Sequence, residues 1–253
     1  GIFRPVFLEA LPKIHMNRTA IDAKADGSFN SLIVLNQSKA DYAIDVDLFD
    51  LQGNKIKETI HSEIKKGNTE TFISGKFENI KSWNPEWPTL YDLKISLKKG
   101  GEILHETTER IGFRTVELRE HDGFYINNEK VVFKGVCRHS FWPETGRCLS
   151  EANILDDIRL IKEMNMNAVR CSHYVPDKRF LELCDSMGLF VLDEVTGWQD
   201  GYDTIVGPKV IKETIDLGMY SFPGCFSPTE CFSAIAQGTK TIGLFPSSVL
   251  GAT

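Results

Sequence analysis

The sequence predicts a multidomain chain of β and α/β class, in which an immunoglobulin-like β-sandwich precedes a partial (β/α) TIM-type barrel. Residues 11–113 alternate apolar and polar side chains with a period of two, which is typical of half-buried strands. After about Asp122, short apolar runs alternate with amphipathic segments, and this order predicts parallel strands connected by helices. With 253 residues, the chain is long enough for one large domain or two ordinary ones.

The sandwich prediction depends on short strands and their turns. Tyr42, Ile44, Val46 and Leu48 alternate with polar neighbours, as in a strand with one buried face. Gly-Asn pairs and a Gly-Gly pair separate runs that are rich in Ile, Val, Thr and Phe. About seven strands fit this spacing and no convincing helix does, so an immunoglobulin-like sandwich is the natural interpretation.

The front of the barrel is predicted from residue 131 onward. The continuous apolar run 131–133 is expected to be the first parallel strand, buried on both faces. Ser150 is expected to cap a helix that carries Ile154, Ile158 and Ile161 on one face.

The next strand–helix–strand unit follows directly. A second strand is expected from Asn167, and Asp177 is expected to cap a second helix that Gly188 ends. A third strand should occupy residues 189–192. Further elements are predicted at 208–218 (helix), 227–238 (helix with a capping box) and 242–246 (strand). About five barrel strands can be counted, fewer than the eight of a closed barrel.

Composition narrows the class of protein. The formal charge of −6 argues against a nucleic-acid or anionic-membrane partner, and no apolar run approaches the roughly 18 residues of a membrane helix. The fractions of apolar and charged residues are those of a soluble globular protein. The N-terminus has no secretory-signal pattern, but the chain starts as if inside a longer polypeptide, so the choice between cytoplasm and periplasm stays open. The six cysteines form no C-x-x-C pair and are expected to be free thiols rather than zinc ligands.

Polar side chains follow three successive predicted strands, at the end where barrel enzymes carry their working residues. The candidate substrate-binding residues are Arg138, His139, Arg170, His173, Tyr174, Asp193, Glu194 and Trp198. A sugar site needs such donors and acceptors for hydroxyl groups, together with carboxylates for acid–base work.

Structural roles compete with this interpretation. A single Arg or His at a strand end more often satisfies loop carbonyls, although three consecutive polar strand ends favour a site. A carboxylate of Asp193-Glu194 can instead pair with Arg170 across the barrel. Trp198 is either a platform on which a sugar stacks or a loop anchor on top of the barrel.

Several motifs resemble glycoside hydrolase family 2, which includes β-galactosidases and β-glucuronidases. They are the run Val132 to His139 with Pro143-Glu144-Thr145-Gly146, the run Asn167 to Tyr174, and Leu192-Asp193-Glu194. Gly1-Ile2-Phe3-Arg4-Pro5-Val6 resembles the exit from that family's jelly-roll domain, and Trp83-Asn84-Pro85, Leu90-Tyr91 and Ile111-Gly112-Phe113-Arg114 resemble the end of its sandwich. The similarity covers residues 1–215.

The resemblance implies a retaining glycosidase that acts on a β-linked glycoside or oligosaccharide, with one glutamate as acid/base and another as nucleophile. By similarity, His139, His173 and Asp193 would line the pocket for the terminal sugar and Arg170 would brace it. The full-length family protein is a possible homo-oligomer.

The sequence departs from the family where catalysis would occur. No Asn-Glu pair follows the third predicted helix, and the pair Asn128-Glu129 lies before the first barrel strand. After Glu194 the chain also lacks the Glu-x-His group with which many β-galactosidases hold magnesium. We therefore expect no catalytic residue, no metal and no cofactor in this chain, and no activity from the chain alone.

The tail resembles a different family, the 2-keto-3-deoxy-6-phosphogluconate aldolases. The resemblance rests on the runs Leu217 to Tyr220, Pro223 to Glu230 and Leu244 to Ser248. The Schiff-base lysine of that family corresponds to Gly243 here, which has no amine, and Lys240 lies three residues earlier.

We therefore expect four segments: the end of a jelly roll (1–12), a sandwich (13–115), the N-terminal part of a barrel (116–215) and an aldolase-like segment (216–253). The leading hypothesis is a glycoside hydrolase of the β-galactosidase type that lacks its catalytic glutamates. The alternatives are an aldolase fragment acting on keto-deoxy-phospho sugar acids, or a carbohydrate-binding module without chemistry.

Overall fold

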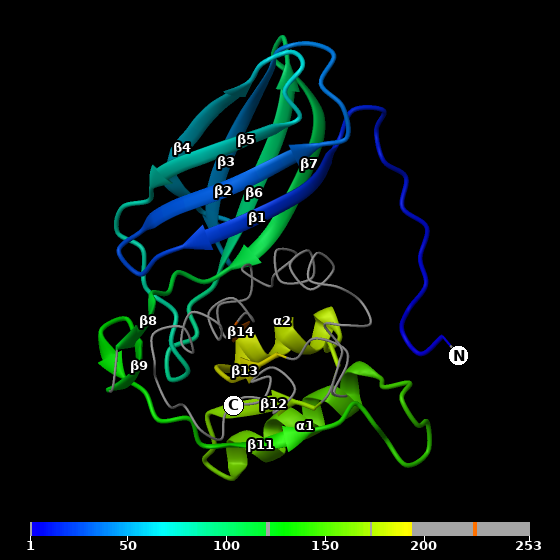
Figure 1. Ribbon diagram of the computed structural model, residues 1–253, viewed down its shortest axis with the longest axis vertical. Helices are drawn as coiled ribbons and strands as arrows, with labels where there is room; N and C mark the ends of the chain where they lie inside the picture. Colours follow the sequence, from blue (N-terminus) through cyan, green and yellow to red (C-terminus); the bar gives the residue numbers. More distant parts are fainter. Residues whose placement is uncertain (1, 120–121, 173, 194–224, 227–253) are drawn as a thin grey trace, which may run out of the picture. The chain divides into compact units, whose positions relative to one another are not determined.

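The computed structural model describes residues 2–119, 122–172, 174–193 and 225–226 (Figure 1). The chain divides into two compact units, and each is described by itself. The sandwich unit comprises Val6–Trp83 and Thr89–Thr115. The barrel unit comprises Gly1–Pro5, Asn84–Pro88 and Val116–Thr253.

The sandwich unit contains seven antiparallel strands in its described residues, which confirms the predicted β-sandwich. Two sheets have the strand orders β1-β2-β5 and β4-β3-β6-β7 (Figure 1). The strands are β1 (Met16–Ala23), β2 (Ser28–Leu35), β3 (Tyr42–Asp50), β4 (Lys55–Ile64), β5 (Glu70–Lys76), β6 (Tyr91–Lys99) and β7 (Glu102–Ile111).

The sandwich core follows from the alternation in the sequence. In β3, Ile44, Val46 and Leu48 are fully buried, while the residues between them are more exposed. An aromatic cluster continues this core, in which the ring of Phe113 meets those of Phe77 and Tyr91 edge-on at centroid distances of 6.1 and 5.5 Å. Edge-to-face pairs of this kind add to the free energy gained from apolar burial.

A partly buried carboxylate connects three strands of the sandwich. Asp45 on β3 accepts a hydrogen bond from Lys98 on β6, and its Oδ1 lies 2.7 Å from Nδ1 of His61 on β4. Burial raises the pKa of Asp45, but the hydrogen bonds from Lys98 and His61 outweigh it, so the pKa lies below its ordinary value. The ionised carboxylate therefore stabilises the folded state.

We expect Asp45→Asn to reduce the loss of stability in acid. Because the folded pKa is lowered, the stabilisation by Asp45 is present above its unfolded pKa of about 3.9 and disappears as pH falls through the folded value. Urea unfolding at pH 7 and pH 3 measures the effect, with Asp41→Asn as the control because Asp41 is 63% exposed and 3.8 Å from its Lys65 partner. An Asp45→Asn protein that loses as much stability in acid as the wild type would contradict the prediction.

The barrel unit begins with a small antiparallel sheet of order β10-β9-β8. Its strands are β8 (Val116–Arg119), β9 (Gly123–Ile126) and β10 (Glu129–Lys130). Asn127 and Asn128 form the β9–β10 turn with φ angles of 51° and 69°, a left-handed conformation that Asn tolerates better than most residues. The Asn128-Glu129 pair therefore lies in a surface hairpin, as expected from the sequence.

A parallel sheet of order β11-β12-β13-β14 follows, and it confirms the partial barrel. Its strands are β11 (Gly135–Arg138), β12 (Ala168–Cys171), β13 (Phe190–Leu192) and β14 (Cys225–Phe226). The helices α1 (Glu151–Glu163) and α2 (Lys178–Met187) connect the first three strands.

The first barrel strand is not where the sequence predicted it. Residues 131–133 are not in a strand, and β11 begins at Gly135 instead. Val132 is 65% exposed, whereas the ring of Phe133 packs edge-on between Phe124 and Phe190, at 5.3 Å from each. This apolar run therefore packs the small antiparallel sheet against the beginning of β13 rather than forming a strand buried on both faces.

The helix boundaries match the sequence signals. Ser150 caps α1 and exchanges hydrogen bonds with Asn153 in a capping box, and Ile154, Ile158 and Ile161 are buried. Asp177 caps α2 by accepting a hydrogen bond from the backbone of Arg179. The two helices bury an apolar layer with Val169, Cys171 and Val191 of the sheet.

The elements predicted at 208–218, 227–238 and 242–246 lie outside the described residues. Of the six cysteines, Cys137, Cys148, Cys171 and Cys184 are free thiols, as expected. Burial raises the pKa of the Cys184 thiol well above its ordinary value, which keeps this thiol neutral and unreactive. Among the described residues, no helix has the length and apolar composition needed to cross a membrane.

Candidate functional site

The two faces of the parallel sheet carry different side chains. One face packs on α1 and α2 through residues such as Val169 and Val191. Cys137, Arg170 and Leu192 are paired in register across β11, β12 and β13, and they alternate with those residues, so they belong to the opposite face. Nη1 of Arg170 lies 3.6 Å from Sγ of Cys137 on this face. Arg170, one of the predicted sugar-binding residues, therefore lies on the face of the sheet that is turned away from the helices.

Arg138 points to the helix side instead. Its side chain is only 7% exposed, and its Nε donates a 2.8 Å hydrogen bond to Oδ2 of Asp157 on α1. Nη2 is also 2.8 Å from this oxygen, in an ion-pair contact without hydrogen-bond geometry. The guanidinium carbon lies 4.4 Å from the ring centroid of Phe180 on α2. These contacts favour a structural role for Arg138, between sheet and helices.

His139 and Tyr174 come together from two different loops. His139 follows β11 and Tyr174 follows β12, and their ring centroids are 6.1 Å apart. The Tyr174 hydroxyl accepts a 2.8 Å hydrogen bond from the backbone N–H of Ser140. This hydrogen bond joins the loops after the first two barrel strands, at the C-terminal end of the strands. In barrel enzymes, this end carries the catalytic residues.

Asp193 directly follows β13 and is 9% exposed. Arg170 pairs in register with Leu192, so Asp193 lies one residue beyond the level of Arg170, toward the C-terminal end of the parallel strands. The remaining predicted site residues, His173, Glu194 and Trp198, lie outside the described residues. In the part of the chain that the structure describes, no group of histidine, cysteine and acidic side chains is arranged to hold a metal ion.

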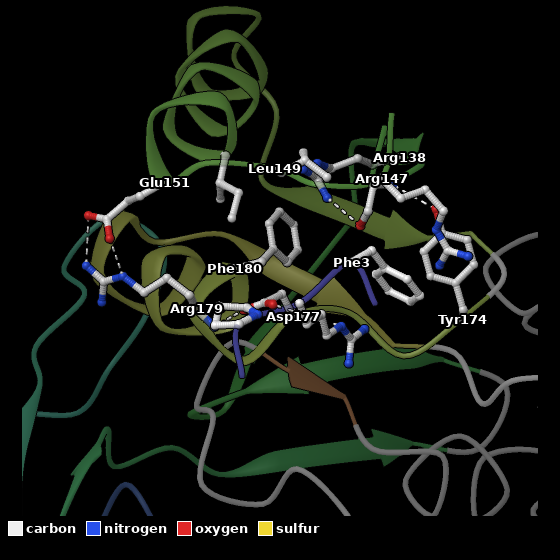
Figure 2. A pocket seen from close by; sticks show the side chains of 13 residues that line it. Phe3, Arg138, Arg147, Leu149, Glu151, Tyr174, Asp177, Arg179 and Phe180 are labelled. Atoms are coloured by element: carbon white, nitrogen blue, oxygen red, sulfur yellow. Dashed lines mark hydrogen bonds and ion pairs between the residues drawn. The ribbon is translucent and has the colours of Figure 1, made fainter. Parts of the chain in front are cut away.

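A pocket of about 230 Å³ opens beside the N-terminal ends of α1 and α2 (Figure 2). Its charged lining consists of Arg4, Arg138, Arg147, Arg179, Glu151 and Asp177. Arg179 forms a bidentate ion pair with Glu151, at 2.8 and 3.0 Å, which raises the pKa of Arg179 and lowers that of Glu151. The pocket contains Arg138 and Phe180 and therefore lies on the helix side of the sheet, apart from the face of Arg170.

Most of these lining residues are not among the predicted site residues. Phe3 and Arg4 belong only to the motif that resembles a jelly-roll exit, and Arg147 directly follows Pro143-Glu144-Thr145-Gly146 but was not predicted to lie in a site. Their partners are far away in the sequence, so no local period or spacing indicated these contacts.

Comparison with known families identifies both units. The model of the glycosyl hydrolases family 2 matches residues 11–114, and the model of that family's TIM barrel domain matches residues 116–217. Residues 11–217 belong to glycosyl hydrolase family 2. The aldolase resemblance of residues 216–253 is not supported by these comparisons.

Individual relatives are named as glycosidases. A β-galactosidase of Streptococcus thermophilus is 37% identical over 206 residues, which is 77% of this chain and 19% of the relative. A putative β-glucuronidase of Formosa agariphila is 30% identical over 79% of this chain and 25% of its own length. The chain thus spans about a fifth to a quarter of the length of these curated relatives.

Solved structures of glycosidases share the fold. A β-glycosidase from Bacteroides vulgatus superposes with a TM-score of 0.75 and 25% identity, covering 89% of this chain and 31% of the other. A β-glucuronidase of Parabacteroides merdae superposes with a TM-score of 0.70 at 18% identity, covering 85% of this chain and 28% of the other.

Proposed function

We propose that this chain supplies part of the sugar-binding wall of a family 2 glycoside hydrolase of the β-galactosidase type, and that the chain alone binds a β-linked glycoside without cleaving it. The names of the family 2 relatives, β-galactosidase and β-glucuronidase, support the substrate class. The proposal keeps the bounds 1–12 for the end of a jelly roll, 13–115 for the sandwich and 116–215 for the front of the barrel.

The observation that carries the proposal is the polar end of the parallel sheet. His139, Tyr174 and Asp193 follow three consecutive strands, and Arg170 lies on the face opposite the helices. Imidazole, phenol, guanidinium and carboxylate groups together supply the donors and acceptors that sugar hydroxyls need. Such groups can orient a terminal sugar, and a buried carboxylate such as Asp193 makes charge-assisted hydrogen bonds to hydroxyls.

Cleavage by a retaining glycosidase requires two carboxylates about 5 Å apart, one to protonate the leaving oxygen and one to attack the anomeric carbon. Glu129, in the single Asn-Glu pair of the sequence, is exposed in the β9–β10 hairpin. The sheet of this hairpin packs through Phe124 and Phe133 on Phe190 at the beginning of β13, whereas Asp193 follows the end of β13. We therefore do not expect Glu129 to act on a sugar held by Asp193. The chain thus carries side chains that can bind a sugar, but not the two carboxylates that would cleave its glycosidic bond.

Binding without turnover is the expected result for the purified chain. We expect calorimetry to give a galactose Kd on the order of 1 mM, because few hydroxyl contacts without further subsites yield only weak affinity. No nitrophenol should be released from nitrophenyl β-galactoside or β-glucuronide. Arg170→Ala should weaken binding by about tenfold or more, through the loss of a charged donor worth at least 1.4 kcal/mol.

Arg159→Ala is the matched control, since Arg159 is a 59% exposed cation on α1 whose ion pair with Asp156 is 3.6 Å long. It should leave the galactose Kd unchanged. Release of nitrophenol would overturn the proposed lack of cleavage, and a wild-type chain that binds neither galactose nor glucuronate would overturn the proposed sugar-binding wall.

A further inference from the structure

The side chain of Arg147 lies between two aromatic rings of the barrel unit (Figure 2). Its guanidinium carbon is 4.2 Å from the ring centroid of Phe3 and 4.2 Å from that of Tyr174. A planar guanidinium stacks well on aromatic faces through its positive charge and its flat shape. Among the described residues, Arg147 makes no ion pair or hydrogen bond, so these two rings are what holds its side chain in place.

The three stacked residues come from three separate segments. Phe3 belongs to the N-terminal segment, Arg147 to the loop between β11 and α1, and Tyr174 to the loop between β12 and α2. The neighbour of Phe3 fastens the first segment, because Arg4 donates a hydrogen bond to the carbonyl of Val175. The stack therefore connects the N-terminal segment to the loops that follow the first two barrel strands.

Arg4 reaches a second group at the start of α2. Its Nε lies 3.9 Å from Oδ2 of Asp177, the N-cap residue of that helix. The hydrogen bond to the carbonyl of Val175 and the ion pair with Asp177 hold Arg4, and with it the neighbouring Phe3, beside the start of α2. Phe3 is thereby placed beside the guanidinium of Arg147, although part of its ring stays exposed to solvent.

At its Tyr174 end, the stack contacts the loop that carries His139, one of the residues proposed to bind the sugar. The hydroxyl of Tyr174 accepts the backbone N–H of Ser140, next to His139, whose ring is 6.1 Å from that of Tyr174. The loop from His139 to Arg147 is closed on itself by a 2.7 Å hydrogen bond from Trp142 N–H to the Gly146 carbonyl. A shift of Arg147 or Tyr174 would therefore move the loop that carries His139.

We propose that Arg147, clamped between Phe3 and Tyr174, is a positioning residue that holds the His139 loop in its sugar-binding position. This inference rests on the proposed function, since His139 is assigned there to the sugar-binding wall. The clamp makes the N-terminal segment a part of the site, although its residues do not lie on the face of Arg170.

Amide hydrogen exchange of Ser140, followed by NMR in the intact chain, tests the clamp. Phe3→Ala and Arg147→Met should each raise the exchange rate of this amide by about tenfold, because loss of either stacking partner frees the Tyr174 ring that carries the acceptor. Phe3 is 38% exposed, so the change to alanine leaves the buried core intact. Both variants should also weaken galactose binding while the Tm stays close to that of the wild type.

Three further variants sharpen the test. Phe3→Trp keeps an aromatic face over Arg147 and should restore the slow exchange and the galactose affinity. Tyr174→Phe keeps the stack but removes the acceptor, so it should speed the exchange of Ser140 without releasing Arg147. Arg159→Ala removes another exposed cation, which lies outside the clamp, and should change neither measurement.

Unchanged Ser140 exchange in both Phe3→Ala and Arg147→Met would overturn the clamp, as would faster exchange that Phe3→Trp fails to reverse. The exchange measurement is independent of sugar. If the wild-type chain binds no galactose, the proposed function falls, whereas faster exchange in the two variants would still support Arg147 as the residue that holds the loop.

Discussion

Replacing Gly188 with alanine is expected to destabilise the barrel unit by about 3 kcal/mol, the sum of backbone strain and a steric clash. Gly188 ends α2 with φ +70°, a left-handed conformation that costs any other residue about 1 kcal/mol. An added Cβ would also lie 2.0 Å from the carbonyl oxygen of Pro85 and 2.8 Å from its carbonyl carbon. Backbone atoms cannot rotate away, so the segment Asn84–Pro88 would have to move off the helix end.

Gly146 provides a matched control for this prediction. It also has a positive φ, +62°, but an added Cβ would meet nothing within 4 Å. Gly146→Ala should therefore cost only the conformational part, about 1 kcal/mol. Urea unfolding, together with hydrogen exchange of the α2 amides, measures both variants. Equal losses for the two glycines would show that the approach of Pro85 to the helix end contributes nothing to stability.

The same glycine shows what the sequence could and could not predict. Its role as the end of α2 was predicted, because Gly past an amphipathic segment is a local signal. Its contact with Pro85 joins residues roughly a hundred positions apart, and no periodic pattern encodes such a pair. Ser150 and Asp177 were predicted as helix caps for the same local reason, and both predictions are confirmed.

The misplaced first barrel strand has a related cause. The run 131–133 is apolar enough for a buried strand, and local pattern alone cannot distinguish a strand from a packing segment. Phe133 is half-buried and packs against Phe124 and Phe190, which belong to two different sheets. The strand itself begins at Gly135, where an added Cβ would lie 2.2 Å from the carbonyl oxygen of Ala168 on β12. The close approach of two backbones explains why Gly occupies this strand position.

The candidate site was predictable in its position but not in its side-chain directions. Polar residues at successive strand ends indicated the rim of a barrel, and His139 and Tyr174 do come together there. Alternation along β11 places Cys137 and Arg138 on opposite faces, but the sequence alone does not show which of these faces the helices cover. Arg138 consequently stood among the sugar-binding candidates, whereas its side chain contacts α1 and α2.

The ion pair between Arg138 and Asp157 is expected to stabilise the barrel unit. Asp157→Asn should destabilise the barrel unit by about 2–3 kcal/mol, because removal of one partner leaves a buried charge uncompensated. Asp157 is 28% exposed, so water can partly compensate the charge of the Arg138 guanidinium beside it. The loss of stability should therefore stay below that caused by breaking a fully buried ion pair. Glu151→Gln, which breaks the exposed pair with Arg179, is the control and should change stability little.

A double variant separates charge compensation from packing. Arg138→Met with Asp157→Leu removes both charges and keeps apolar volume beside Phe180, so it should recover most of the stability that Asp157→Asn loses. Urea unfolding and galactose titration of the double variant then decide the role of Arg138. If Arg138 holds the sheet to its helices, the double variant is stable and binds galactose like the wild type. If Arg138 contacts the sugar, stability returns but galactose binding does not, and the residue would then have to leave the helix side when the sugar binds.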